Sequence, residues 1–192
     1  AVITGANAGA VTEDIAVSAS GKLDVTEVDS GEAHFQAGDI VGQHGTLHLV
    51  ADGRWTYELD HAASQHLGAG DTATDTLTVR SVDGTTHQIA ISVTGTNDNA
   101  AITGISVGTV TEDTQLTFSG KLDITDVDTG DALVRAIPHG TGQHGEFVVH
   151  ADGSWSYTLS PTDTAVQALR PGDAPLTDTI TYLDEGDWAV IT

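Results

Sequence analysis

The chain has 192 residues, and its 28 Asp and Glu against 6 Lys and Arg give a formal net charge of −22. That charge repels nucleic acid phosphates and anionic lipid headgroups, so it excludes nucleic acid as a partner. No apolar run is as long as a membrane span, so we expect no membrane insertion. The lack of Cys excludes disulfides, thiol catalysis and Cys-ligated zinc.

Two copies of one module make up the sequence. The recurring segments keep their residues and their order along the chain. They are Ile3-Thr4-Gly5 and Ile102-Thr103-Gly104, Val11-Thr12-Glu13-Asp14 and Val110-Thr111-Glu112-Asp113, and Gly42-Gln43-His44-Gly45 and Gly142-Gln143-His144-Gly145. We expect repeat 1 at residues 1–96, a linker at residues 97–101 and repeat 2 at residues 102–192.

The expected elements of repeat 1 are short strands. Residues 46–50 and 54–59 flank Asp52-Gly53, which is a strong signal for a hairpin turn. Residues 76–79 and 88–93 alternate apolar and polar side chains on either side of Asp83-Gly84. Short strands separated by Gly and Asp turns are typical of a β-sandwich.

Helix signals are nearly absent. Only residues 62–67 and 164–169 have a sequence compatible with a helical turn, and no long amphipathic helix separates the strands. The sequence therefore predicts an all-β protein of two tandem Greek-key β-sandwiches, similar to immunoglobulin domains.

Repeat 2 is shorter than repeat 1 at its C-terminal end. Only Leu183-Asp184-Glu185-Gly186-Asp187 separates Tyr182 from Trp188, and Ala189-Val190-Ile191-Thr192 repeats Ala1-Val2-Ile3-Thr4. We expect either the loss of the terminal hairpin or a cut within it. A lost hairpin would leave a sheet edge open to pairing with another strand.

The acidity of the chain points to a metal. Charged residues make up 18% of the chain, below the usual quarter, so the unusual feature is the shortage of basic residues. Acidic side chains gather in three places, where Asp-x-Asp or Asn-Asp-Asn supplies the oxygen ligands that calcium prefers. These places are Glu13-Asp14 with Glu112-Asp113, Glu27-Val28-Asp29 with Asp126-Val127-Asp128, and Asn97-Asp98-Asn99. For any one cluster alone, turn formation is the better explanation, but a linker rich in Asn and Asp between acidic loops favours a metal.

Other candidate sites have simpler explanations. His44 and His144 recur in a turn, where a polar turn residue is a better interpretation than a zinc ligand. Trp55 and Tyr57 lie two residues apart on one strand face, as do their counterparts in repeat 2, which is typical of a sandwich core. A duplicated set of carboxylates without a marked nucleophile argues against one catalytic centre, so we expect no enzyme activity.

These motifs together resemble a known family. The order Glu-Asp, Gly-Lys-Leu-Asp, Asp-Val-Asp-x-Gly, Asp-Gly-x-Trp-x-Tyr and Gly-Thr-Asn-Asp resembles the VCBS repeat of bacterial RTX-type surface adhesins, and it is also similar to cadherin modules. The resemblance implies calcium at the joint between consecutive domains. It also implies an extracellular location, on a bacterial cell surface or secreted.

The resemblance implies two sets of calcium ligands. The joint between the repeats would use one set, which consists of Glu13, Asp71, Asn97, Asp98, Asn99, Asp126, Asp128 and Asp184. The other set, Glu27, Asp29 and Asp83, would form a half-site facing a preceding repeat.

The function implied is that of a calcium-rigidified extender in a large adhesin that serves cell adhesion or biofilm formation. Its partners would be neighbouring repeats of the same polypeptide, and the chain would be a monomer. Two alternatives stay open: a module that binds a surface glycan or protein through its variable loops, and homophilic pairing through an exposed sheet edge.

Overall fold

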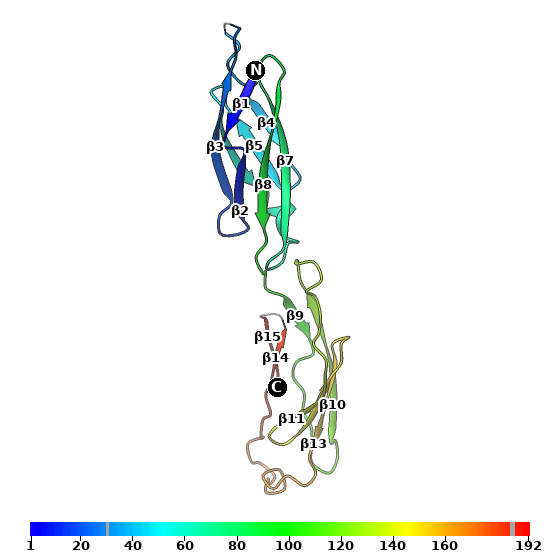
Figure 1. The fold of residues 1–192 in the computed structure, drawn as a ribbon. Coiled ribbons are helices and arrows are strands. Elements are labelled where there is room, and N and C mark those ends of the chain that lie inside the picture. Colours follow the sequence, from blue (N-terminus) through cyan, green and yellow to red (C-terminus); the bar gives the residue numbers. More distant parts are fainter. Residues whose placement is uncertain (30, 185–186) are drawn as a thin grey trace. The chain divides into compact units, whose positions relative to one another are not determined.

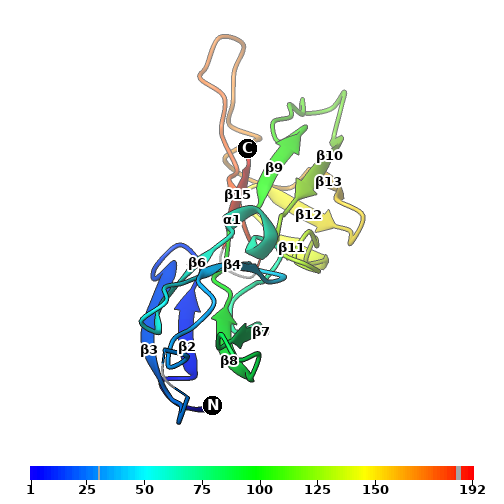
Figure 2. The ribbon, with the colours of Figure 1, turned by 90° about the horizontal axis from the view of Figure 1, so that it is seen from above.

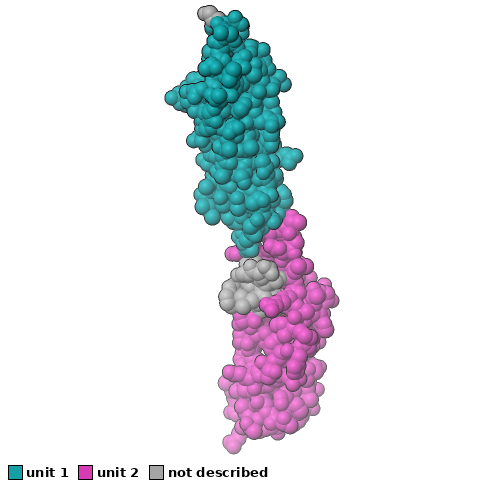
Figure 3. Space-filling model, viewed as in Figure 1, with its two compact units in different colours: residues 1–98 teal, residues 99–192 magenta. Residues whose placement is uncertain are grey.

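The computed structural model describes residues 1–29, 31–184 and 187–192, with only the backbone described at residues 182–184 and 187–190. The chain divides into two compact units, unit 1 at residues 1–98 and unit 2 at residues 99–192 (Figure 3).

Unit 1 is a sandwich of two sheets (Figure 1). One sheet has the strand order β1-β3-β6-β5-β4, and the other has the order β2-β8-β7. The bounds are β1 Val2–Gly5, β2 Ala8–Thr12, β3 Ser18–Thr26, β4 Gly38–Val41, β5 Gly45–Leu49, β6 Arg54–Leu59, α1 His61–Ser64, β7 Thr72–Arg80 and β8 Thr86–Thr94. The short helix α1 is the single turn visible in Figure 2.

The core of unit 1 follows from alternation along its strands. β7 and β8 bury every second residue, and Leu77, Ile89 and Ile91 are inaccessible or nearly so. Trp55 and Tyr57 of β6 are also buried, which confirms their predicted core role. The predicted turn at Asp52-Gly53 joins β5 to β6, and Gly53 has a φ of 85° that favours glycine.

The chain closes this sandwich with a parallel pair. β2 runs parallel to β8, from Ala8 opposite Ala90 to Thr12 opposite Thr94. The N terminus and the β7–β8 turn lie at one end of unit 1, and the last residue of β8 lies at the other (Figure 1). We call these the N-terminal end and the linker end of unit 1.

Unit 2 repeats the larger sheet in the order β11-β12-β13-β10-β9, whereas its second sheet is the hairpin β14-β15. The bounds are β9 Ala101–Gly104, β10 Thr117–Thr125, β11 Ile137–Thr141, β12 Gly145–Val149, β13 Ser154–Leu159, β14 Ile180–Asp184 and β15 Asp187–Ile191. The all-β prediction of two tandem sandwiches is confirmed.

The end of unit 2 differs from one expectation. Residues 189–192 do not resemble the start of a third repeat in structure, because β15 pairs antiparallel with β14 and Ile191 is buried in the unit 2 core. A terminal hairpin is therefore present, so of the two expectations the loss of the hairpin is wrong and the cut within it stays a prediction. The predicted helical turn at residues 164–169 contains turns only.

Candidate metal centres

Glu13 occupies the linker end of unit 1. Its side chain has 0% exposure, its Oε1 accepts a hydrogen bond from Gln65 Nε2 at 2.9 Å, and its Oε2 is buried without a hydrogen-bond partner. A buried carboxylate oxygen without a donor is costly, since the group has lost water and gained nothing in exchange. Glu13 therefore offers one oxygen to a cation.

A tight turn directs Glu13 inward. Thr12 and Ala16 pair across it, and Asp14 takes a left-handed backbone conformation with a φ of 55°. Asp tolerates that conformation better than most residues, which explains the Glu-Asp order. The amide of Glu13 donates to the Thr94 carbonyl at 3.0 Å and so fixes the turn beside the end of β8.

The chain leaves unit 1 at Gly95, whose position is fixed by a hydrogen bond and by close packing. The Gly95 amide donates to the Asp71 carbonyl at 3.0 Å, while the Asp71 side chain is exposed. A Cβ at Gly95 would lie 2.1 Å from the Leu67 carbonyl oxygen, so only glycine fits there. Glu13, Asp71 and the start of the linker thus share one end of unit 1.

The linker residues 97–99 follow Gly95 closely in the chain. Asn97 Nδ2 donates to the Asp98 carbonyl at 2.7 Å, the side chains of Asn97 and Asn99 are exposed, and Asp98 is half-buried. Asn97 and Asp98 belong to unit 1, and Asn99 belongs to unit 2.

In unit 2 the Asp-x-Asp motif lies where the chain enters from the linker. Thr125, the last residue of β10, pairs with Ala101, the first residue of β9. The next loop buries Asp128 to 3% exposure, and the Asp128 amide donates to Asp126 Oδ1 at 2.8 Å. The carboxylates of Asp126 and Asp128 therefore share one loop at that end of unit 2.

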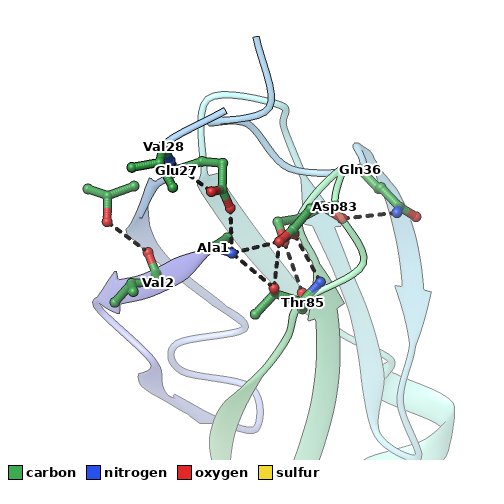
Figure 4. Close-up of polar contacts among 9 residues, drawn as sticks. Ala1, Val2, Glu27, Val28, Gln36, Asp83 and Thr85 are labelled. Carbon is green, nitrogen blue, oxygen red and sulfur yellow. Dashed lines mark hydrogen bonds and ion pairs between the residues drawn. The ribbon is translucent and has the colours of Figure 1, made fainter. Parts of the chain in front are cut away.

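The N-terminal end of unit 1 brings together two of the three predicted half-site residues (Figure 4). The N-terminal ammonium of Ala1 lies 2.5 Å from Glu27 Oε2 and 2.6 Å from Asp83 Oδ2. Hydrogen bonds to Asp83 and Glu27 raise the pKa of this amine to about 10. The same ammonium, with neighbouring donors, lowers the pKa of Glu27 and of Asp83 below their usual range.

Two predicted ligands are less constrained. Asp29 is exposed, and its carbonyl accepts a hydrogen bond from the Glu32 amide. Asp184 ends β14 opposite Asp187, and its side chain lies outside the described residues. Among the described residues, no three Asp, Glu or His side chains form a ready-made metal cluster. The joint set divides between the two units, and it stays a prediction.

One aspartate in each unit, buried in unit 1 and half-buried in unit 2, escaped the sequence analysis. Asp75 accepts hydrogen bonds from the Gln43 and His44 amides and, at 2.7 Å, from the Tyr57 hydroxyl. Asp178 makes the same contacts in unit 2. Burial and the neighbouring carboxylate raise the pKa of Tyr57 far above its usual value. These hydrogen bonds fix the Gly-Gln-His-Gly turn in each unit. The sequence signal that could have revealed them is that the Asp, the Tyr and the turn recur together in both repeats.

One segment has the sequence of a catalytic motif but not its structure. Gly104-Ile105-Ser106-Val107-Gly108 has the Gly-x-Ser-x-Gly spacing. That motif requires a strained turn from a strand into a helix, which presents the serine. Here the segment follows β9 and no helix follows it, and the Ser106 carbonyl accepts a hydrogen bond from the Thr192 amide at 2.8 Å. The structure therefore gives Ser106 no nucleophile elbow.

The sequence of each repeat matches a known family model. A model described as bacterial cadherin-like domain matches residues 1–95 and again residues 97–186. The chain belongs to the bacterial cadherin-like domain family. The comparison with curated proteins gives no match. Within the described residues of this cadherin-like chain, no helix has the length and apolar character needed to cross a membrane.

Two solved structures of protocadherins show the same fold at low identity. Domains 3–6 of protocadherin gamma B7, solved as a cis-dimer, are 16% identical with a TM-score of 0.53, over 98% of this chain and 46% of that chain. The extracellular cadherin domains 3–6 of protocadherin gamma B2 are 16% identical with a TM-score of 0.53, over 99% of this chain and 46% of that chain. A Ca²⁺-stabilized adhesin with which an Antarctic bacterium binds ice is 18% identical, with a TM-score of 0.27, over 94% of this chain and 44% of that chain. The cadherin-like chain thus spans less than half the length of these proteins.

Proposed function

We propose that the chain is a calcium-binding, calcium-stiffened pair of extender domains, of the VCBS type, from a large extracellular bacterial adhesin. In this proposal it carries no catalytic activity. It acts as a structural segment that holds a distant adhesive part away from a cell surface.

The observation that carries the proposal is the buried carboxylate of Glu13. A calcium ion is the simplest partner for its Oε2, because calcium takes six to eight oxygen ligands from carboxylates, carbonyls and water. Asp71 and the start of the Asn97–Asn99 linker share that end of unit 1. Asp126 and Asp128 lie at the linker-facing end of unit 2. Each unit therefore carries acids at the end joined to the linker.

The N-terminal end of unit 1 supports a second calcium half-site. The carboxylates of Glu27 and Asp83 come close together there, because each lies within 2.6 Å of the same Ala1 nitrogen. Two carboxylates that converge in this way can bind one calcium ion. Asp29 follows Glu27 closely in the same loop, so it would complete the set.

The proposed mechanism is electrostatic. Without calcium, carboxylates gathered at a linker repel one another, and the linker is free to bend. Calcium neutralises them and ties the linker to both domains, so the pair straightens and stiffens. Extracellular calcium modules bind with a Kd on the order of 10⁻⁴–10⁻³ M, which suits the calcium concentration outside cells.

Calorimetric titration with calcium tests the ligands. Glu13→Gln, Asp98→Ala and Asp128→Ala should each lose at least one joint site, because each removes a carboxylate from the proposed cluster. Glu112→Gln is the matched control, since Glu112 is the counterpart of Glu13 in unit 2 and should leave the joint sites intact. Circular dichroism checks that every variant keeps its β-sheet content. Full binding by Glu13→Gln and Asp128→Ala would contradict the proposal.

Small-angle scattering tests the stiffening. We expect a larger maximum dimension and a narrower distribution of interdomain distances with calcium than with chelator. Asp128→Ala should give the same curve under both conditions. Identical dimensions of the unmodified chain with and without calcium would contradict the mechanism.

A further inference from the structure

Gln65 is the residue that holds the buried carboxylate of Glu13 in place. Its side-chain amide donates to Glu13 Oε1 at 2.9 Å, while the second oxygen of that carboxylate is buried without a hydrogen-bond partner. The amide is neutral, so this hydrogen bond leaves the negative charge of Glu13 uncompensated. A buried carboxylate in that state needs a cation close by.

The orientation of the Gln65 amide follows from its neighbours. A carboxylate oxygen only accepts hydrogen bonds, so the amide atom that faces Glu13 Oε1 must be the nitrogen. The same nitrogen lies 3.3 Å from Nδ1 of His61, which accepts its other hydrogen when the neutral ring carries its proton on Nε2. Both N–H groups of the amide therefore have acceptors. Within the described part of the chain, no hydrogen bond ends on the carbonyl oxygen of Gln65.

The backbone around Gln65 is fixed at the linker end of unit 1. The main-chain amide of Gln65 donates to the His61 carbonyl at 3.2 Å and so closes α1. Leu67, two residues further along, is 8% exposed, and its carbonyl oxygen is the atom that a Cβ at Gly95 would approach to 2.1 Å. α1 and Leu67 therefore fix Gln65 close to the point at which the chain leaves unit 1.

The same contact recurs in unit 2 on a different backbone. Gln167 donates through Nε2 to Glu112 Oε1 and, at 3.3 Å, to the Pro161 carbonyl. Its segment, residues 164–169, contains turns and no helix, unlike the segment that carries Gln65. In both units the described acceptors take the N–H groups, so the carbonyl oxygen is the atom left to bind a ligand. A contact that persists while its surroundings change favours a role for the amide itself.

We propose that Gln65 is a calcium ligand, through its carbonyl oxygen, in the same site as Glu13 Oε2. This inference rests on the proposed calcium site at the linker end of unit 1 and extends it by a ligand that is not an acid. Amide carbonyls are among the oxygens that calcium accepts. The hydrogen bond holds the amide and the carboxylate together, so one ion can bind the two oxygens that remain.

Two substitutions at one position separate a ligand from a residue that only positions Glu13. Gln65→Leu removes both the hydrogen bond and the carbonyl oxygen, and it should weaken one calcium site by at least about tenfold in calorimetric titration. Gln65→Glu keeps an oxygen ligand but cannot donate to Glu13, so it should bind calcium at least as tightly as the unmodified chain does. If Gln65 only positioned Glu13, both variants would lose affinity, and that result would overturn the proposal.

Two control variants match these changes. Gln167→Leu makes the same substitution in unit 2 and should leave the site that Gln65→Leu weakens at full affinity. Gln88→Glu adds the same charge at an exposed position of β8, so it measures how far a further carboxylate alone raises calcium affinity, and we expect a change of less than about twofold. Circular dichroism in chelator checks that every variant keeps its fold.

Side-chain NMR of the unmodified chain tests the proposal without any substitution. Calcium should shift the resonance of the Gln65 side-chain carbonyl carbon, because the ion polarises the bond to its oxygen, and it should leave that of the exposed Gln88 in place. If the chain binds calcium and the Gln65 resonance does not move, the proposal is wrong while the proposed calcium site stands. If the unmodified chain binds no calcium, the proposed function fails as well.

Discussion

Asp75 holds three hydrogen-bond donors inside unit 1, and its own side chain is 1% exposed. Asp75→Ala would leave the Gln43 and His44 amides and the Tyr57 hydroxyl without their acceptor. We expect the free energy of unfolding of unit 1 to fall by about 3 kcal/mol, as for other hydrogen bonds to a buried charge. Urea unfolding followed by Trp fluorescence measures the change. Glu58→Ala, at an exposed carboxylate whose only ion pair in that part of the described chain is a 4.0 Å contact with His48, should change it by less than about 0.5 kcal/mol.

His48 provides a pH-dependent contact on the surface of unit 1. Its Nδ1 lies 2.6 Å from Asp39 Oδ1 of β4, and its Nε2 lies 4.0 Å from Glu58 Oε2 of β6. The hydrogen bond to Asp39 is the main cause that raises the pKa of His48 above its usual value of 6.5. A raised pKa means that the contact stabilises the fold fully below pH 6.5 and that this contribution is lost as the pH rises through the folded pKa.

An NMR titration of the His48 ring measures this effect. We expect a pKa above 6.5 in the unmodified chain and a value closer to 6.5 in Asp39→Asn. Because both side chains are exposed, salt should reduce the difference. A His48 pKa that Asp39→Asn leaves unchanged would contradict this account.

At the scale of the elements, the two hairpins β7–β8 and β14–β15 differ most. β7 and β8 are nine-residue strands that pair from Thr72 opposite Thr94 to Arg80 opposite Thr86, whereas β14 and β15 pair over five residues. The shorter hairpin therefore has fewer paired residues to hold its strands together. We expect amides of β14 and β15 to exchange with solvent at least about tenfold faster than those of β7 and β8.

Hydrogen exchange followed by mass spectrometry measures this difference peptide by peptide. β6 and β13, which are both six-residue strands inside the larger sheets, serve as internal references. Equal protection of the two hairpins would show that the short hairpin is as stable as the long one.

Much of this fold follows from local signals in the sequence. The turn at Asp52-Gly53, the alternation in residues 88–93 and the aromatic pair Trp55 and Tyr57 each depend on neighbouring residues, and the structure confirms each of them. Local signals also identified Glu13 as an acid in a turn. They could not show that its side chain is buried, because that depends on Gln65 and Thr94, far along the chain.

The other differences between the expectations and the structure also arise from contacts between residues that are far apart in sequence. The hydrogen bonds of Asp75 join three segments that are separate in sequence, so no local pattern contains them. The hairpin β14–β15 was misjudged because residues 189–192 repeat residues 1–4 in sequence, whereas their pairing with β14 determines their structure.

For the whole molecule, the charge of −22 sets the response to salt and calcium. Raising NaCl to 0.5 M screens repulsion between distant carboxylates and should raise Tm slightly. Calcium at 10 mM should raise Tm further, because one site with a Kd on the order of 10⁻⁴–10⁻³ M contributes about 1.4–2.7 kcal/mol at that concentration.

Thermal unfolding in NaCl, in calcium and in magnesium separates the two effects. Magnesium is the control, since it has the same charge but demands a stricter octahedral geometry. Equal Tm values in calcium and magnesium would mean that the divalent charge alone stabilises the chain.

The parallel pairing of β2 with β8 governs when unit 1 can assume its final form. Ala8 cannot pair until Ala90 has emerged, because the two residues are partners in the β2–β8 ladder. The sandwich therefore stays open until nearly all of its residues have left the ribosome or the secretion channel. Such distant pairing makes folding slow compared with that of helical domains, in the range of milliseconds to seconds. A chain of these units would therefore mature one unit at a time, each completed by the arrival of its own last strand.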